Sequence, residues 1–269
     1  MVMPSTNAVG TPAIEFTEEQ KFIFDPRGWI ALPGVLNDDE VVEMREFCYR
    51  LQREPESIPE PHRSSIGGPL ERLTDHPAVL GFMNEFVASG YSNEECYGFR
   101  LEGTFLTIRA KGQDHFRPHG GRGMHNFPGN SHTYHMHPDK VHSGLTRVVW
   151  ELNPVKKRGG GTMFLNGSHK AAFPPPKTTE NRDCPLWEDY SCPAGSVLFF
   201  TEAITHSGAR WEDDTADRVA IFNCYNVIGN KWHKWEPHPA HLAEMPFKRR
   251  TLFRPVYCQD NVPSVSDGV

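Results

Sequence analysis

The pattern of short apolar segments is the strongest constraint on how this chain can fold. Residues 193–200 read Pro-Ala-Gly-Ser-Val-Leu-Phe-Phe, a turn that leads into an apolar run, and a second apolar run covers 218–225. Runs of this length that are bounded by Gly and Pro are typical of buried strands. Residues 97–110 alternate apolar and polar side chains, which indicates a further strand, and more strands are expected from about residue 145 onward.

Two helices are expected before most of these strands. One is predicted at 77–89 and the other at 38–53, where apolar residues recur at helical spacing between charged ones: Val41, Val42, Met44, Phe47, Cys48 and Leu51. Early helices followed by many strands predict a mainly β fold with flanking helices. We expect a double-stranded β-helix, the jelly roll of cupin-like proteins.

The length of the chain favours one domain. A chain of 269 residues can enclose a substantial core, and no repeat or low-complexity linker divides it. We therefore predict a single domain over 1–269, with loose polar tails at about 1–15 and 259–269. Residues 111–134 are dense in Gly, His, Arg and Asn, and we interpret them as an active-site loop, with plain disorder as the alternative.

Composition excludes several classes of partner. A formal net charge of −6 argues against nucleic acid, and the 38% of hydrophobic residues include no apolar stretch near the length of a membrane span. Residues 1–15 lack the basic and apolar regions of a signal peptide. The six cysteines form no Cys-x-x-Cys pair, so reduced thiols in a cytoplasmic protein are the simpler expectation.

Four residues point to a metal centre. His137-Pro138-Asp139 places an imidazole and a carboxylate one residue apart, and His206 follows the predicted strand at 196–200. Two imidazoles and one carboxylate on one face of the ion are the ligands of non-haem iron(II) oxygenases. Arg218 opens the next strand, and its planar fork matches one carboxylate of a dicarboxylate co-substrate.

Several segments, taken in order, resemble the phytanoyl-CoA dioxygenase family of iron(II)/2-oxoglutarate oxygenases. The resemblance runs from residue 22 to about 226. It rests on Phe-Ile-Phe-Asp-Pro-Arg-Gly-Trp-Ile-Ala-Leu-Pro-Gly-Val-Leu at 22–36, Val-Val-Trp-Glu-Leu at 148–152, and Gly-Gly-Thr-Met-Phe-Leu-Asn-Gly-Ser-His-Lys at 160–170.

The resemblance implies an Fe(II)/2-oxoglutarate-dependent dioxygenase that uses O2 to oxidise an unactivated C–H bond of a small-molecule substrate, with release of succinate and CO2. Carried over by position, it makes His137, Asp139 and His206 the iron ligands, Arg218 the 2-oxoglutarate clamp and Trp150 a residue that lines the co-substrate pocket. Pro138 and Gly208 depart from the family pattern. Some hydrogen bonds to 2-oxoglutarate are therefore expected from other groups, such as Ser207 or Thr107.

Two other functions use the same residues. His135-Met136-His137-Pro138-Asp139 is a His-x-His-x-Asp array, which zinc metallohydrolases use to bind one or two ions. Lys140 follows the array where those enzymes usually have a further histidine. The other alternative is a non-catalytic jelly roll that binds a small molecule, which we would expect to have lost a ligand or the arginine.

Overall fold

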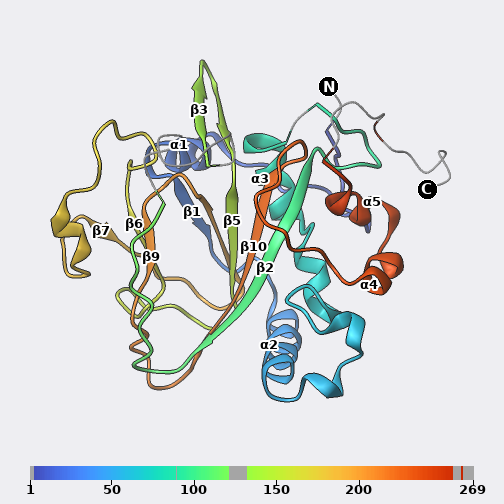
Figure 1. Cartoon of the computed structure of the whole chain (residues 1–269), viewed down its shortest axis with the longest axis horizontal. Coiled ribbons are helices and arrows are strands. Elements are labelled where there is room, and N and C mark those ends of the chain that lie inside the picture. The colour runs from blue at the N-terminus through green and yellow to red at the C-terminus, as the bar shows by residue number, and fades with distance from the viewer. Residues whose placement is uncertain (1–2, 89, 121–131, 257–261, 263–269) are drawn as a thin grey trace. The chain divides into compact units, whose positions relative to one another are not determined.

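The computed structural model describes residues 3–88, 90–120, 132–256 and 262 (Figure 1). The chain divides into two compact units that are interleaved along it. Unit 1 comprises Met1–Thr17, Glu46–Phe105 and Asn223–Val269, and unit 2 comprises Glu18–Arg45 and Leu106–Phe222. Within the described ranges, no helix is both long and apolar enough to cross a membrane.

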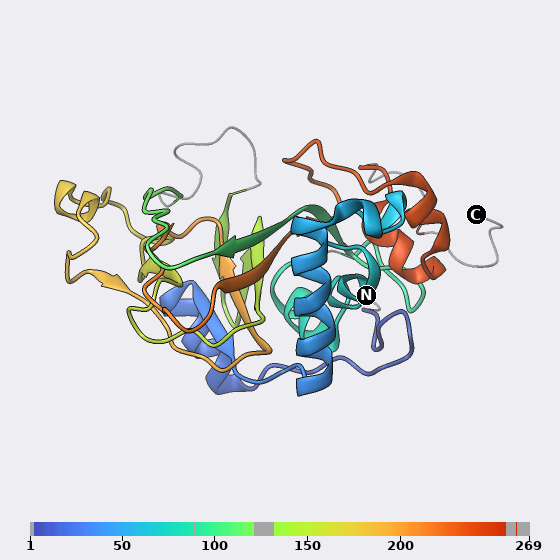
Figure 2. The same cartoon turned by 90° about the horizontal axis from the view of Figure 1, so that it is seen from below.

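Unit 2 carries most of the strands. Its elements are α1 (Glu18–Arg27), β1 (Trp29–Leu32), β3 (Tyr134–His137), β4 (Lys140–Ser143), β5 (Thr146–Glu151), β6 (Thr162–Leu165), η5 (Lys177–Glu180), β7 (Trp187–Glu188), β8 (Ser196–Thr201) and β9 (His206–Gly208). Three elements run from one unit into the other: α2 (Asp38–Arg53), which is an unbroken helix (Figure 2), β2 (Phe99–Arg109) and β10 (Arg218–Val227).

Unit 1 carries most of the short helices. These are η1 (Pro55–Ser57), η2 (Glu60–His62), η3 (Gly68–Leu73), α3 (Pro77–Phe86), α4 (Pro239–Glu244), α5 (Phe247–Arg250) and η6 (Thr251–Phe253).

The strands form the two main sheets of a jelly roll and one hairpin. The five-stranded sheet has the order β1-β8-β5-β10-β2, the three-stranded sheet has the order β7-β6-β9, and β3 pairs with β4 alone. Except for β6 and β7, neighbouring strands in the two main sheets are not consecutive along the chain, as the crossing connections of this fold require. The predicted mainly β fold with flanking helices is therefore confirmed.

The core of unit 2 lies between its two main sheets. The Trp29 ring on β1 stacks on the Phe164 ring of β6, with 4.9 Å between ring centroids, and Phe200 on β8 meets Phe164 edge to face at 5.2 Å. Alternate side chains of a strand point to the same face, so the inward rows of β5, β8 and β10 add Val149, Leu198 and Ala220 to this cluster. Polar side chains that belong to the same inward-facing rows of β5, β8 and β10 therefore also lie inside the jelly roll.

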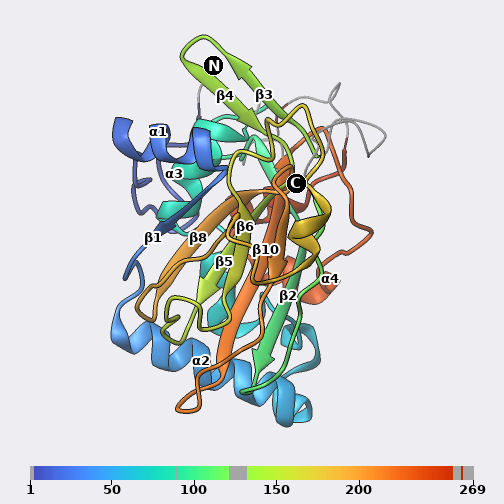
Figure 3. The ribbon, with the colours of Figure 1, turned by 90° about the vertical axis from the view of Figure 1, so that its left-hand side faces the viewer.

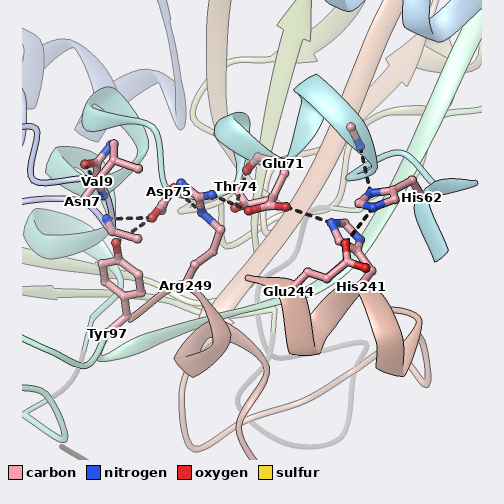
Figure 4. Close-up of polar contacts among 12 residues, drawn as sticks. Asn7, Val9, His62, Glu71, Thr74, Asp75, Tyr97, His241, Glu244 and Arg249 are labelled. Carbon is pink, nitrogen blue, oxygen red and sulfur yellow. Dashed lines mark hydrogen bonds and ion pairs between the residues drawn. The ribbon is translucent and has the colours of Figure 1, made fainter. Parts of the chain in front are cut away.

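A buried polar network in unit 1 holds the N-terminal segment in place (Figure 4). Arg249 donates to Asp75 at 2.9 Å and also forms an ion pair with Glu71. The Tyr97 hydroxyl donates to Asp75 at 2.8 Å, and the backbone N–H of Ala8 donates to the same carboxylate at 3.0 Å. The N-terminal segment is thus bonded at Ala8 to a buried carboxylate, as buried polar groups generally are.

Candidate functional site

His137 and Asp139 lie at the tip of an exposed hairpin. His137 ends β3 and is the register partner of Lys140 on β4, and Asp139 occupies the turn with a φ of 58°. Both side chains are exposed. Figure 3 shows this hairpin extending beyond the end of the five-stranded sheet. Among the contacts of the described residues, none joins either residue to His206.

The base of this hairpin is braced by the Gly-Ser-His-Lys stretch at 167–170. The Tyr134 hydroxyl donates to Asp25 at 2.8 Å, and Lys170 forms an ion pair with the same carboxylate. The His169 Nε2 donates to the Asp25 carbonyl at 2.9 Å, and its ring packs edge to face on Tyr134 at 4.6 Å. His169 therefore braces the loop.

His206 lies inside the jelly roll. It opens β9, its register partner on β6 is Phe164, and only 5% of its surface is exposed. Its Nδ1 donates to the Ile204 carbonyl at 2.9 Å, which leaves the lone pair on Nε2. Burial lowers the pKa of His206 to about 4, so the ring is neutral at pH 7. A neutral imidazole whose other nitrogen is fixed by a carbonyl is the usual form of a metal-binding histidine.

A second histidine, His119, lies against His206. The backbone groups of the two residues exchange hydrogen bonds of 3.0 and 2.9 Å, and their ring centroids are 4.2 Å apart. The His119 Nδ1 donates to the Arg117 carbonyl at 2.7 Å, which again leaves Nε2 available. Gly120 permits this approach, because a Cβ at that position would lie 2.5 Å from the Ile204 carbonyl oxygen.

The carboxylate nearest to His206 belongs to Glu202. Its Oε2 lies 3.6 Å from the His206 Nε2, while its Oε1 accepts a hydrogen bond of 2.7 Å from the Arg147 Nε and forms an ion pair with the Arg147 Nη2 at 2.7 Å. Burial alone would raise the pKa of Glu202, but Arg147 and His206 hold it at about 2. An ionised carboxylate oxygen therefore faces an imidazole lone pair with no proton between them, and a cation would satisfy both groups.

The side chains of His206, His119 and Glu202 do not form a three-ligand cluster in the conformations described. In the described part of the chain, three ligand atoms lie within 4.8 Å of one another only at Glu102, Cys224 and His233. The exposed His119 side chain would have to turn toward Glu202 and His206 to complete a two-imidazole, one-carboxylate set. Such a turn is inexpensive for an exposed side chain.

Arg218 is buried and already paired. Its guanidinium makes a two-pronged ion pair with Glu151, through Nε at 3.2 Å and through Nη2, and it also donates to the Tyr190 hydroxyl at 3.2 Å. Glu151 and Tyr190 raise the pKa of Arg218 against the opposing effect of burial. In the structure, the Arg218 guanidinium thus binds the Glu151 carboxylate. From the sequence, we expected a carboxylate of the co-substrate at this position.

A second arginine lies next to Arg218, and among the described residues no ion pair joins it to a carboxylate. Arg109 is 2% exposed and donates to the Ala209 carbonyl and, at 2.7 Å, to the Gly160 carbonyl. The two carbonyls belong to residues close in sequence to Gly208 and Thr162, which are register partners on β9 and β6. Arg218 contacts the same part of the sheet, because it donates to the Thr162 hydroxyl at 3.3 Å. Burial, and then repulsion by Arg218, lower the pKa of Arg109 to about 10. Two guanidiniums with one carboxylate leave an excess positive charge inside the jelly roll.

The remaining predicted residues have other surroundings. Trp150 is fully buried, but it lies between Val149 and Glu151 on β5 and so points to the opposite face of the strand from Glu151. The Ser207 hydroxyl accepts from the Arg117 backbone N–H at 2.7 Å and donates to the Gly208 carbonyl at 2.9 Å. Within the predicted active-site loop, 121–131 lie outside the described residues.

Comparisons with known proteins bear on the fold. No protein-family model and no curated protein sequence matches the chain. HygX from Streptomyces hygroscopicus with nickel and 2-oxoglutarate bound is 24% identical with a TM-score of 0.64, over 82% of this chain and 90% of that chain. EctD from S. alaskensis is 15% identical with a TM-score of 0.60, over 97% and 90%.

A third solved structure gives a similar result. SnoK, a non-heme alpha ketoglutarate dependent carbocyclase from nogalamycin biosynthesis, is 16% identical with a TM-score of 0.57, over 91% of this chain and 95% of that chain. Similarity at such low identity establishes a shared architecture and no more. The chain accordingly has the double-stranded β-helix fold of these three proteins.

Proposed function

We propose that this protein is a non-haem Fe(II)/2-oxoglutarate-dependent dioxygenase that oxidises an unactivated C–H bond of a small molecule and releases succinate and CO2. The observation that carries the proposal is the buried Glu202 carboxylate beside the His206 imidazole, in a jelly roll. Two similar folds support it: HygX was solved with iron, with 2-oxoglutarate and with hygromycin B, and SnoK is described as alpha ketoglutarate dependent. The sequence resemblance to the phytanoyl-CoA dioxygenase family agrees with it.

The proposed iron ligands are His206, His119 and Glu202. His206 is common to this set and to the set predicted from sequence. His119 is backbone-paired with His206, and Glu202 faces it, whereas His137 and Asp139 lie on the exposed hairpin. Residue 121, two positions after His119, is glycine, so a His-x-acid motif is not available there and the carboxylate has to come from another segment.

The proposed 2-oxoglutarate site is the arginine pair. Arg218, the clamp predicted from sequence, and Arg109 together carry one more positive charge than Glu151 neutralises, and a carboxylate of the co-substrate would balance it. When bound, iron(II) and 2-oxoglutarate supply the oxidising chemistry. The chain's own contribution is to orient both groups and, through the apolar wall of Trp29, Phe164 and Phe200, to exclude water.

The experiment that tests the proposal is anaerobic addition of iron(II) and then 2-oxoglutarate to metal-free protein, followed by visible absorption. The proposal expects the weak charge-transfer band of the iron chelate in wild type and its loss in His206→Ala. No band in wild type would overturn the oxygenase assignment. Tight binding of zinc that depends on His135, His137 and Asp139 would favour the metallohydrolase alternative instead.

A further inference from the structure

We propose that Glu102, Cys224 and His233, all in unit 1, form a second metal site that binds a zinc-type divalent cation. One ligand atom from each of these residues lies within 4.8 Å of one atom from each of the other two. The ligands of a tetrahedral zinc ion, at about 2.0–2.3 Å from the metal, are roughly 3–4 Å apart. The three side chains therefore need only small adjustments to share one ion.

The fold brings these residues together from three segments. Glu102 lies on β2, Cys224 lies on β10, which is the neighbour of β2 in the five-stranded sheet, and His233 follows β10. The His233 ring lies over the backbone of Gly103, where an added Cβ would be 3.4 Å from its Cγ. This is an ordinary van der Waals distance, which places the ring directly against the strand that carries Glu102.

The surroundings of Glu102 suit a cation. The carboxylate is fully buried, and its Oε2 accepts from the Trp232 backbone N–H at 3.0 Å and from the Asn226 amide at 3.3 Å. Its Oε1 contacts the His233 Nδ1 at 2.7 Å. Two neutral donors fix one oxygen and so orient the other toward His233 and Cys224, as groups around a metal site commonly orient a ligand.

The charges of the three groups favour a divalent ion of the zinc type. A carboxylate and a thiolate balance two positive charges, and the imidazole adds a neutral ligand. A sulfur ligand selects zinc, cobalt or a similar metal over calcium and magnesium, which prefer oxygen. Cys224 is fully buried, while the His233 side chain is 35% exposed, so the ion would reach the site from the histidine side, where solvent could complete four-coordination.

Cobalt(II) absorption tests this site separately from the proposed iron centre. Cobalt bound by a thiolate gives an intense near-ultraviolet charge-transfer band, whereas a centre built from His206, His119 and Glu202 contains no sulfur. We expect the band when cobalt(II) is added anaerobically to the full-length, metal-free protein. It should be absent in Cys224→Ser, and it should persist in His206→Ala and in Cys48→Ser, a buried cysteine on α2.

A second variant keeps the test decisive if Cys224→Ser fails to fold. His233→Ala alters a partly exposed side chain in the segment after β10, and it should weaken zinc binding by about tenfold or more, measured by competition with a chromophoric chelator. The metal-free variant should lose some thermal stability, because the buried Glu102 loses its 2.7 Å contact with His233, but it should still unfold in one cooperative transition. No thiolate band in wild type, or zinc affinity unchanged in His233→Ala, would refute the site, whether or not 2-oxoglutarate binds at the iron centre.

Discussion

The Nε2 of His206 lies 3.6 Å from one carboxylate oxygen of Glu202, and Arg147 holds the other oxygen of that carboxylate through a hydrogen bond and an ion pair. His206 and Glu202 are both buried. Arg147 therefore does two things: it compensates a buried charge and it fixes which oxygen faces the imidazole. This relationship connects the stability of the protein with its proposed metal binding.

Removing Arg147 should destabilise the metal-free protein. In Arg147→Met, the buried Glu202 carboxylate loses its cation, and breaking a buried pair in this way costs about 3–5 kcal/mol. A divalent ion at the same carboxylate should restore part of the loss. Urea unfolding with and without nickel(II) measures both effects, and a variant as stable as wild type without metal would contradict the role given to Arg147.

Replacing Arg218 should lower the stability of the protein, which would not be expected if this residue only bound the co-substrate. Arg218→Ala leaves Glu151 buried and unpaired, so we expect a loss of about 3–5 kcal/mol in the free energy of unfolding. The double variant Arg218→Met with Glu151→Leu removes both charges and should recover most of it. If the double variant also needs much more 2-oxoglutarate than wild type, the arginine acts on the co-substrate as well; an unchanged requirement would place the clamp elsewhere.

Gly120 should tolerate no side chain. In Gly120→Ala, the new Cβ would lie 2.5 Å from the Ile204 carbonyl oxygen, at a backbone φ of +73°. Strain and overlap together should cost about 2 kcal/mol or more and displace His119 from His206. Gly10→Ala is the matched control, since it has a φ of +84° but nothing within 4 Å of its Cβ, and it should cost about 1 kcal/mol. Equal losses in the two variants would show that the contact has no effect.

His169 should make the protein less stable in mild acid. Burial lowers its pKa from 6.5 to about 4, so between these values the unfolded chain binds a proton that the folded chain does not. Stability is therefore full above pH 6.5 and is lost as the pH falls toward 4, by about 1–2 kcal/mol between pH 7 and pH 5. His169→Gln should reduce this pH dependence in urea unfolding, and His238→Gln, at an exposed position, should not. A wild-type pH dependence in His169→Gln would mean that other groups cause it.

Much of the secondary structure could be predicted from the sequence because it depends on local patterns. The helix expected at 38–53 is α2 with the same bounds, and the strands expected at 196–200 and 218–225 are β8 and β10, each slightly longer. The helix expected at 77–89 ends earlier, at Phe86. The division into two interleaved units was not predictable, because it depends on contacts between segments far apart in the chain.

The candidate site was predictable only in part, for a similar reason. His206 and Arg218 were singled out and lie inside the jelly roll, since the strands that carry them could be predicted. His119 lies beside His206 through a long-range backbone bridge, which no local pattern predicts, whereas Glu202 precedes His206 by four residues in a Glu-x-x-x-His spacing that was not singled out from the sequence. Pro138 and Asp139 form the turn of the hairpin, a use to which Pro followed by a residue of positive φ is well suited. The His-x-acid pattern does not distinguish such a turn from a ligand pair.

The central claim is that Glu202 supplies the carboxylate of the iron centre, and one matched pair of variants tests it directly. Glu202→Gln and Asp139→Asn each remove one negative charge with little change in shape. After anaerobic addition of iron(II) and 2-oxoglutarate, we expect the charge-transfer band to be lost in Glu202→Gln and to persist in Asp139→Asn. The reverse result would contradict this account and restore the ligand set read from His137, Asp139 and His206.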